Sequence, residues 1–303
     1  MIGGKNVDGI IPLWKPKGMT SHDCVFKIRK ILKTKKVGHG GTLDPNVEGV
    51  LPICVGKATK LIDYLHEYPK TYYGTISLGT STTTEDSDGE IVEQVALTAI
   101  PDIDVIDHQM AKFQGKISQV PPMYSAVKVN GKRLYEYARE NIQVERPQRE
   151  VEIYHFQRMT EPIMTNNNVE WSFLTKCSKG TYIRTLAVDL GASLGYPAHM
   201  KSLSRLSSGG FETKEAVKLE DVEEAVNTKM LHTVLYPIEK ITSQFTNYHL
   251  TAAEYKKVCN GQFLQLNLAE VNEVALYYGK RCVAIYELRD QVWKPQKMLN
   301  LEL

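Results

Sequence analysis

A glycine-rich stretch holds the residues of this chain that are best suited to chemistry. It runs from residue 37 to residue 45 and places an imidazole, His39, five residues before a carboxylate, Asp44. Glycines at three of the four positions 38–41 allow the backbone to take positive φ and to approach another surface closely. Because Asp44 precedes a proline, it is biased toward an extended or turn conformation. The stretch therefore predicts a loop that presents one carboxylate and one imidazole to a ligand.

The lysine that follows this loop does not belong to a phosphate-binding P-loop. Six residues separate Gly49 from the pair Gly56-Lys57, where a P-loop has four. Ala58 also stands where a P-loop has the Ser or Thr that binds magnesium. Nucleotide binding of the P-loop type is therefore excluded at this motif.

Composition and cysteine usage limit the class of protein. The chain has 303 residues, 42% of them hydrophobic, which suits one large domain or a large domain followed by a small one. No apolar run approaches the ~20 residues needed to span a bilayer, and residues 1–5 lack the apolar stretch of a signal peptide. The five cysteines are scattered, with no C-x-x-C pair. We therefore expect a cytoplasmic protein with reduced thiols and no zinc ribbon.

Charge is distributed unevenly, although the formal net charge is only +2. Residues 1–60 carry eleven Lys and Arg against four acidic residues, whereas residues 71–111 contain no Lys or Arg. Eight acidic residues lie between Glu85 and Asp107. A basic zone beside the glycine-rich loop suits a polyanionic partner such as nucleic acid, but a solvated basic helix face explains the same charges. The acidic zone argues against nucleic acid wrapped around the whole protein.

Regular elements are expected on both sides of the loop. Residues 10–14 read as a short strand, and Thr20 or Ser21 can cap a helix whose apolar residues recur every three or four positions. Lysines and an arginine occupy the other face of that helix. After the loop, residues 58–68 are expected to form a helix that stops before a proline.

Further along the chain, the pattern alternates between strands and helices. We expect strands at 71–79, 91–95, 151–156 and 169–177, a loop at 82–89, and helices at 103–115, 183–194 and 219–227. Asn130-Gly131 is a strong signal for a two-residue hairpin turn. Arg184 falls in the first turn of its helix, where the helix dipole disfavours a cation, so an acidic group is expected nearby or the helix starts later. Tyr236-Pro237 marks an expected boundary, after which the composition changes.

Seven groups of residues together resemble one known family, the bacterial tRNA pseudouridine synthase B group. In chain order they are Lys15-Pro16-x-Gly18-x-Thr20-Ser21, Gly38-His39-x-Gly41-x-Leu43-Asp44-Pro45, Gly49-x-Leu51-Pro52 with Gly56-x-Ala58-Thr59-Lys60, Lys70-x-Tyr72, Asp86-x-Asp88-Gly89, Pro121-Pro122-x-Tyr124-Ser125-Ala126-x-Lys128, and Cys177-Ser178-x-Gly180-Thr181-Tyr182-Ile183-Arg184. The resemblance covers roughly residues 9–240 and continues more weakly into the tail, at Asn260-Gly261.

The resemblance implies an α+β fold with two parts. Residues 1–240 would form a pseudouridine synthase catalytic domain, with a mixed, mostly antiparallel central sheet and flanking helices. Residues 241–303 would form a small, β-rich, PUA-like RNA-binding module. The implied reaction isomerises uridine 55 in the T-arm loop of tRNA to pseudouridine: the base flips out, its N1–C1′ bond breaks, and it rejoins through C5. The reaction transfers no electrons, so no metal or other cofactor is expected. The protein is expected to act as a monomer on the T-arm stem-loop.

The resemblance assigns catalytic roles to three residues. Asp44 is the expected nucleophile, with attack on C1′, attack on C6 and removal of a sugar proton all left open. Arg184 is expected to pair with Asp44 and keep it ionised. Tyr72 is expected to stack on the flipped uracil. Each residue also has an ordinary alternative: an Asx turn for Asp44, a surface position for Arg184, and a core position for Tyr72.

Five more residues are expected to bind the substrate. His39 would fill the space left by the flipped base, and Gly40 would help the loop to enter the RNA. Leu203 would form an apolar wall of the pocket, or simply belong to the core. Lys15 would hold backbone phosphates, and Tyr182 lies in the same motif as Arg184.

Two other functions remain open at this point. A non-catalytic RNA-binding or tRNA-folding protein could retain the same pocket, and a base-excising hydrolase could use the same carboxylate. The intact set of Asp44, Tyr72 and Arg184 argues against binding as the sole role. Nothing in the sequence positions a hydrolytic water, which argues against the hydrolase.

Overall fold

A computed structural model describes residues 7–268 and 271–300. The contacts divide the chain into two compact units. The first unit comprises Met1–Asn46, Val50–His66 and Ser208–Leu303, and the second comprises Val47–Gly49 and Glu67–Ser207. The functional division into residues 1–240 and 241–303, which the resemblance implies, stays a prediction. The predicted lack of a targeting segment concerns residues outside the described ranges. Within those ranges, no helix has both the length and the hydropathy to cross a bilayer.

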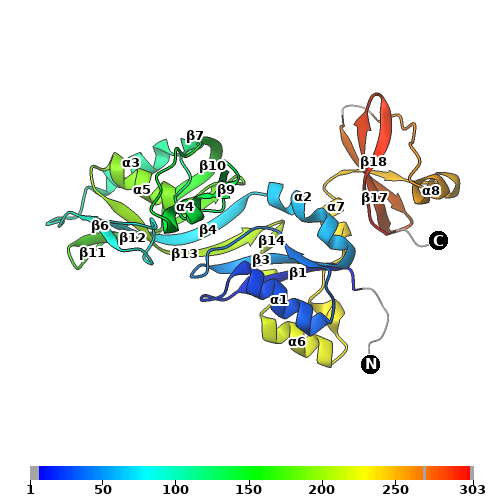
Figure 1. The fold of residues 1–303 in the computed structure, drawn as a ribbon, viewed down its shortest axis with the longest axis horizontal. Helices are drawn as coiled ribbons and strands as arrows, with labels where there is room; N and C mark the ends of the chain where they lie inside the picture. Colours follow the sequence, from blue (N-terminus) through cyan, green and yellow to red (C-terminus); the bar gives the residue numbers. More distant parts are fainter. Residues whose placement is uncertain (1–6, 269–270, 301–303) are drawn as a thin grey trace. The chain divides into compact units, whose positions relative to one another are not determined.

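Outside the tail, the first unit contains strands of the ten-stranded sheet of the described residues, together with helices. Its elements are β1 (Gly9–Lys15), α1 (Ser21–Leu32), β2 (Val37–His39), β3 (Glu48–Val55), the 3-10 helix η1 (Gly56–Leu61), α2 (Ile62–Glu67), β14 (Phe211–Glu212), η2 (Thr213–Glu215), α6 (Leu219–Asn227), η3 (Leu231–Thr233) and α7 (Glu239–Thr242). Strand β3 lies between β1 and β2. Helices α1 and α6 lie together in Figure 1 and share a core with β1 and β3, which includes Leu13, Ile28 and Val222.

Helix α1 begins where the sequence predicts, at a capping box. Thr20 Oγ1 accepts a hydrogen bond from Asp23 N at 3.0 Å, and Asp23 Oδ2 accepts one from Thr20 N at 2.9 Å. These two bonds satisfy backbone donors that a helix start otherwise leaves unpaired. The buried residues of the helix include Val25 and Ile28, so its lysine-rich face points to solvent as predicted.

The tail of the chain forms a four-stranded sheet of its own in the first unit. Its elements are β15 (Thr246–His249), α8 (Ala252–Cys259), β16 (Glu273–Tyr278), β17 (Arg281–Arg289) and β18 (Val292–Met298), with strand order β15-β16-β17-β18. Trp293 and Tyr286 are fully buried in its core. The module contacts α2: Tyr64 Oη donates to Glu273 Oε1 at 3.2 Å, and Lys297 pairs with Asp63 at 3.1 Å.

The second unit is built on a five-stranded order, β13-β4-β12-β10-β7. Its elements are β4 (Lys70–Leu78), β5 (Thr80–Thr82), β6 (Ile91–Gln94), α3 (Ile103–Lys112), β7 (Gly115–Gln119), β8 (Lys128–Val129), β9 (Lys132–Arg133), α4 (Leu134–Arg139), β10 (Arg149–Arg158), β11 (Ile163–Thr165), β12 (Asn168–Cys177), α5 (Ile183–Ser193) and β13 (Ala198–Ser208). Neighbouring strands in this order are antiparallel, whereas β13 pairs in parallel with the start of β3, at Glu48 and Gly49. Helices α3 and α5 contact each other, and α3 contacts β10 (Figure 1).

The predicted α+β class, with a mixed and mostly antiparallel sheet, is confirmed. The hairpin at Asn130-Gly131 is also present, and both residues have the positive φ of a type I′ turn, 51° and 82°. The expected loop at 37–39 is instead strand β2, because its backbone pairs with β3. The helix expected at 103–115 ends at Lys112, because Gly115 already belongs to β7.

Burial of Lys70 generates a prediction about stability. Its side chain donates to Tyr68 O at 2.7 Å, and burial together with the nearby Arg205 lowers the pKa of Lys70 to about 8 from 10.5. The unfolded chain therefore binds more protons between these two values, so this group makes the fold more stable as the pH rises from about 8 toward about 10.5. Lys70→Met should remove that increase, measured by urea denaturation across the window. The exposed Lys112→Met is the control, and parallel curves for wild type and Lys70→Met would contradict the prediction.

Candidate active site

The backbone next to Asp44 is fixed by the first helix. Ser21, which is buried at the start of α1, accepts a hydrogen bond from Leu43 N at 2.9 Å and donates one to Leu43 O at 3.3 Å. Leu43 itself is buried, whereas Asp44 is only half-buried. The residue before Asp44 is thus fixed in two ways: the N and O atoms of Leu43 are both hydrogen-bonded to Ser21, and its side chain is buried.

Lys15 has a different place from the one that we expected. Its side chain is fully buried, and Nζ donates to the carbonyl oxygens of Met19 at 2.5 Å, Pro16 at 3.0 Å and Pro45 at 3.0 Å. A buried ammonium needs such acceptors to offset the loss of hydration. The expected contact of Lys15 with solvent-exposed phosphates does not suit this position, and the residue instead ties the chain after Asp44 to the end of β1.

Two of the three loop glycines pack against α2. A Cβ at Gly38 would lie 2.6 Å from Ile62 Cδ1, and one at Gly40 would lie 2.8 Å from Leu65 Cβ. Gly41 is the one with clearly positive φ, 131°. His39 lies between the two packed glycines, half-buried, with its ring centroid 6.1 Å from that of His22. We predicted that these glycines allow a close approach to another surface. At Gly38 and Gly40, that surface is helix α2 of the protein itself.

Tyr72 and Leu203 lie on one face of the sheet in the second unit. Tyr72 on β4 is directly opposite Arg205 on β13, and Leu203 is two residues from Arg205 on the same strand. Because side chains two residues apart share a face, Tyr72 and Leu203 are diagonal neighbours. Each is 8% exposed. This position is compatible with a pocket wall and with a core role.

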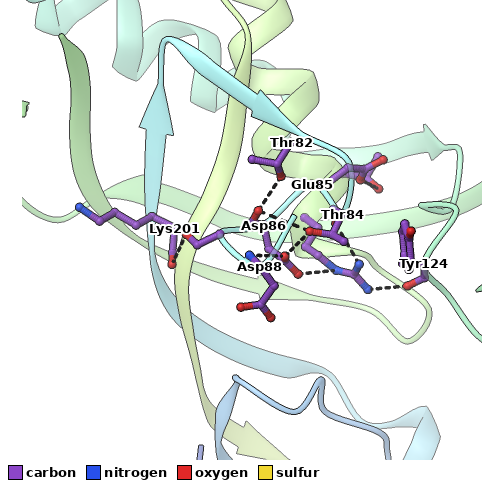
Figure 2. A network of polar contacts seen from close by, with 10 residues as sticks. Thr82, Thr84, Glu85, Asp86, Asp88, Tyr124 and Lys201 are labelled. Carbon is purple, nitrogen blue, oxygen red and sulfur yellow. Dashed lines mark hydrogen bonds and ion pairs between the residues drawn. The ribbon is translucent and has the colours of Figure 1, made fainter. Parts of the chain in front are cut away.

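Arg184 is the centre of a buried polar network at the start of α5. It is the second residue of the helix, as predicted, and it is 6% exposed. Its Nη1 donates to Thr84 O at 3.1 Å, its Nη2 donates to Tyr124 O at 3.0 Å, and its Nε lies 3.8 Å from Asp86 Oδ2. Asp86 is the acidic group that we expected near this helix start. Figure 2 shows Thr84, Asp86 and Tyr124 converging on the guanidinium.

The acidic stretch at 82–89 is an ordered turn that holds Asp86 in place. Asp86 Oδ1 accepts hydrogen bonds from Thr84 Oγ1 at 2.5 Å and from Asp88 N at 3.0 Å, and Asp86 O accepts one from Thr82 Oγ1 at 2.5 Å (Figure 2). Ser87 Oγ donates to the Lys201 carbonyl of β13 at 3.0 Å. The sequence predicted a loop here, but composition alone did not reveal that the threonines serve as donors to the aspartate.

Tyr182 is positioned through its backbone by a residue that the sequence did not single out. The side chain of Gln119, at the end of β7, accepts from Tyr182 N at 3.0 Å and donates to Tyr182 O at 3.2 Å. Gln119 is 1% exposed. A single glutamine at the end of a short strand carries no local signal for this task, because its partner lies 63 residues away.

The described structure thus gathers the candidate residues in two groups. Lys15, His39, Gly40 and Asp44 belong to the first unit. The second unit holds Tyr72, Tyr182, Arg184 and Leu203. The pairing of Asp44 with Arg184 stays a prediction. Among the described residues, no group of three or more His, Cys, Asp or Glu is placed to hold a metal ion.

Known proteins match nearly the whole chain. Residues 29–183 match the family described as TruB family pseudouridylate synthase (N terminal domain), and residues 184–243 match the tRNA pseudouridylate synthase B C-terminal domain. The chain is 48% identical to tRNA pseudouridine synthase B of Streptococcus sanguinis, over 96% of this chain and 99% of the relative. It is 46% identical to the protein of that name from Bacillus pumilus, over 97% and 98%. A chain in the crystal structure of a Cbf5-Nop10-Gar1 complex is 26% identical, with a TM-score of 0.71, over 97% and 84%.

The Arg184 network predicts that Asp86 stabilises the fold. Asp86→Asn removes the negative charge beside a guanidinium that is 7% exposed in its side chain, so we expect a loss of roughly 2–4 kcal/mol in the free energy of unfolding. Urea denaturation measures the loss. Glu90→Gln, an exposed acidic residue of the same stretch, is the matched control and should change stability little. Equal, small effects of the two substitutions would contradict the buried ion pair.

The position of Lys15 predicts a loss of stability without a loss of phosphate contact. Lys15→Met removes the donor that three part-buried carbonyl oxygens share, although Pro45 O keeps its bond from Gly18 N, and this loss should cost roughly 1–3 kcal/mol. The dependence of RNA affinity on salt should keep its slope in this variant, whereas loss of a phosphate contact lowers that slope by about 1. The exposed Lys17→Met serves as the comparison. A lowered slope in Lys15→Met would restore the phosphate role.

Proposed function

This chain belongs to the TruB family of pseudouridylate synthases, and we propose that its substrate is uridine 55 in the T-arm loop of tRNA. The observation that supports the proposal most strongly is the match to tRNA pseudouridine synthase B over almost the full length of both chains. The motif residues of the resemblance also stand on ordered segments, with Asp44 on a loop anchored by Ser21 and Lys15. Because the family is one of enzymes, RNA binding alone does not account for the protein.

In the proposed mechanism, the uridine leaves its stack and enters the pocket, which costs a few kcal/mol in lost stacking and pairing. Asp44 acts as the nucleophile at C1′ or C6, or as the base toward the sugar. The N1–C1′ bond breaks, the uracil turns, and a C5–C1′ bond forms. The proton on C5 is then lost to solvent and N1 takes up a proton in its place, so the product is an isomer of the substrate and no second reactant is consumed.

Arg184 is proposed to orient the Asp44 carboxylate and keep it ionised. A guanidinium already held by two carbonyl oxygens and one carboxylate has little freedom to turn, so it can present its remaining edge in a constant direction. Such preorganisation is useful in a dry site, where charge interactions are strong. Tyr72 is proposed to stack on the uracil, Leu203 to form an apolar wall, and Tyr182 to contact the substrate from the start of α5.

The RNA backbone is proposed to lie along the exposed face of α1. Lys17, Lys27 and Lys30 are exposed, and Lys30 Nζ lies 4.5 Å from the centroid of the Phe26 ring, which is 56% exposed. Lysines near an exposed aromatic ring suit phosphates and unstacked bases. His39 is proposed to occupy the space of the flipped base, with Gly40 beside it. The tail, residues 241–303, is proposed to act as a PUA-like RNA-binding module of a monomeric cytoplasmic enzyme.

Release of tritium tests both the reaction and the residue. With tRNA labelled at uridine C5, the wild-type protein should release one tritium from position 55 for each product formed, and Asp44→Asn should lower the rate at least about a thousandfold, because it removes the nucleophile. RNA affinity of the variant should stay close to that of wild type.

Replacing uridine 55 by cytidine in the labelled tRNA provides the control for position. Release that persists from this tRNA would refute uridine 55 as the target, and full turnover by Asp44→Asn would refute the nucleophile. Free uracil among the products would identify a base-excising hydrolase instead.

A further inference from the structure

Residues 120–148 form an arm between β7 and β10 in the second unit, which consists of the β8–β9 hairpin, α4 and their flanking segments. At the start of the arm, Tyr124 O accepts from Arg184 Nη2 at 3.0 Å. At its end, Arg146 Nη1 donates to Pro121 O at 3.0 Å and therefore closes the arm on itself. Between these ends is an open cleft of about 620 Å³, lined by residues that include Val120, Lys128 and Arg146. Packed side chains do not fill this space, so the polar contacts at the two ends of the arm contribute more to holding it in position.

Arg146 also contacts Glu85, the residue between Thr84 and Asp86, which are two of the partners of Arg184. Its Nη1 lies 3.9 Å from Glu85 Oε1, and the two side chains are 34% and 20% exposed. Thr84 and Asp86, on either side of Glu85, both contact the guanidinium of Arg184. Arg146 thus joins the arm to the turn that holds Arg184.

Glu85 is kept in an unusual conformation by its surroundings. Its φ of 65° is in the left-handed region, which a residue with a long side chain rarely adopts. Its N donates to Thr82 O at 3.2 Å, and its O accepts from Met200 N at 3.0 Å. These bonds hold the backbone, and the strained φ directs the carboxylate toward α5. Figure 2 shows Glu85 on the side of the turn away from Lys201.

The carboxylate of Glu85 reaches the residue that follows Arg184. Glu85 Oε2 accepts from Thr185 Oγ1 at 3.1 Å, and the same hydroxyl lies 3.4 Å from Val120 O at the base of the arm. The charged groups facing Glu85 are Arg184, Arg146 and Asp189. Burial raises the pKa of Glu85, while its bond to Thr185 and the two arginines act in the opposite direction.

The first turn of α5 is therefore held from two sides. The turn 84–86 contacts Arg184 and Thr185, and the arm contacts the same two residues through Tyr124 and Val120. Arg146 is a side chain whose polar contacts join these two sides directly. We propose that Glu85 and Arg146 are positioning residues: their ion pair holds the arm against the turn, and through Tyr124 O it sets the orientation of the Arg184 guanidinium. This inference rests on the role proposed for Arg184 in the reaction.

Activity of single and double variants tests the pair. Glu85→Gln keeps an acceptor for Thr185 but removes the charge, and Arg146→Gln removes its partner. Each should lower kcat between about threefold and tenfold with a smaller change in KM for tRNA, and the double variant should be no worse than the more affected single variant. Arg146→Lys should recover part of the rate because it restores the charge. Lys132→Gln, which removes another positive charge from the arm, should leave kcat unchanged.

Hydrogen exchange of the folded protein provides a readout that does not depend on the substrate. Amides of residues 121–139 should exchange faster in both single variants than in wild type and in Lys132→Gln, because the arm loses the attachment that Arg146 makes to Glu85. Faster exchange without turnover of uridine 55 by wild type would mean that the proposed function fails while the attachment stands. Unchanged exchange, additive losses of kcat in the double variant, or a loss confined to KM would each overturn the inference.

Discussion

Burial of a guanidinium is the constraint on which the second unit depends. Arg184 can remain charged at 6% exposure only if acceptors replace its water, and no single element supplies them all. Thr84 O and Asp86 come from the turn after β5 and Tyr124 O comes from the segment after β7, so these two segments, far apart in the sequence, must meet at the first turn of α5. The helix dipole makes this position still less favourable for a cation. The cost of burying a cation at a helix start is thus offset by tertiary contacts, an arrangement that is common where a functional side chain needs a fixed orientation.

The loop that carries Asp44 is organised around a second buried cation. Lys15 collects three carbonyl oxygens, one of them from the residue after Asp44, and Ser21 binds both backbone atoms of the residue before it. The two candidate catalytic groups therefore share a design. In each, a network of hydrogen bonds holds the segment around the candidate catalytic side chain and limits its movement. Such a base reduces the reorganisation that a reaction demands.

Elements close in sequence could be predicted, and contacts between distant ones could not. Periodicity and capping located α1, β4, α5 and α6, because those signals are local. The motifs located Asp44 and Arg184, and the dipole argument predicted either an acidic group near Arg184 or a later start of the helix. Its identity as Asp86 depends on a turn that composition described only as a loop. Nothing local shows that Lys15 is buried or that Gly38 faces Ile62, since both facts arise from packing across the fold. Gln119 was missed for the same reason.

Helix α2 has neighbours on two of its sides. Ile62 and Leu65 occupy the space that Gly38 and Gly40 leave open, while Asp63 and Tyr64 bind the tail module through Lys297 and Glu273. In six residues, two faces of this helix therefore contact two separate parts of the first unit. Few positions of this helix can therefore change independently. A substitution that is compatible with the glycine-rich segment must also preserve the contacts with the tail module. A tail module taken from another protein would need to form equivalent contacts with Asp63 and Tyr64 before it could replace the native module.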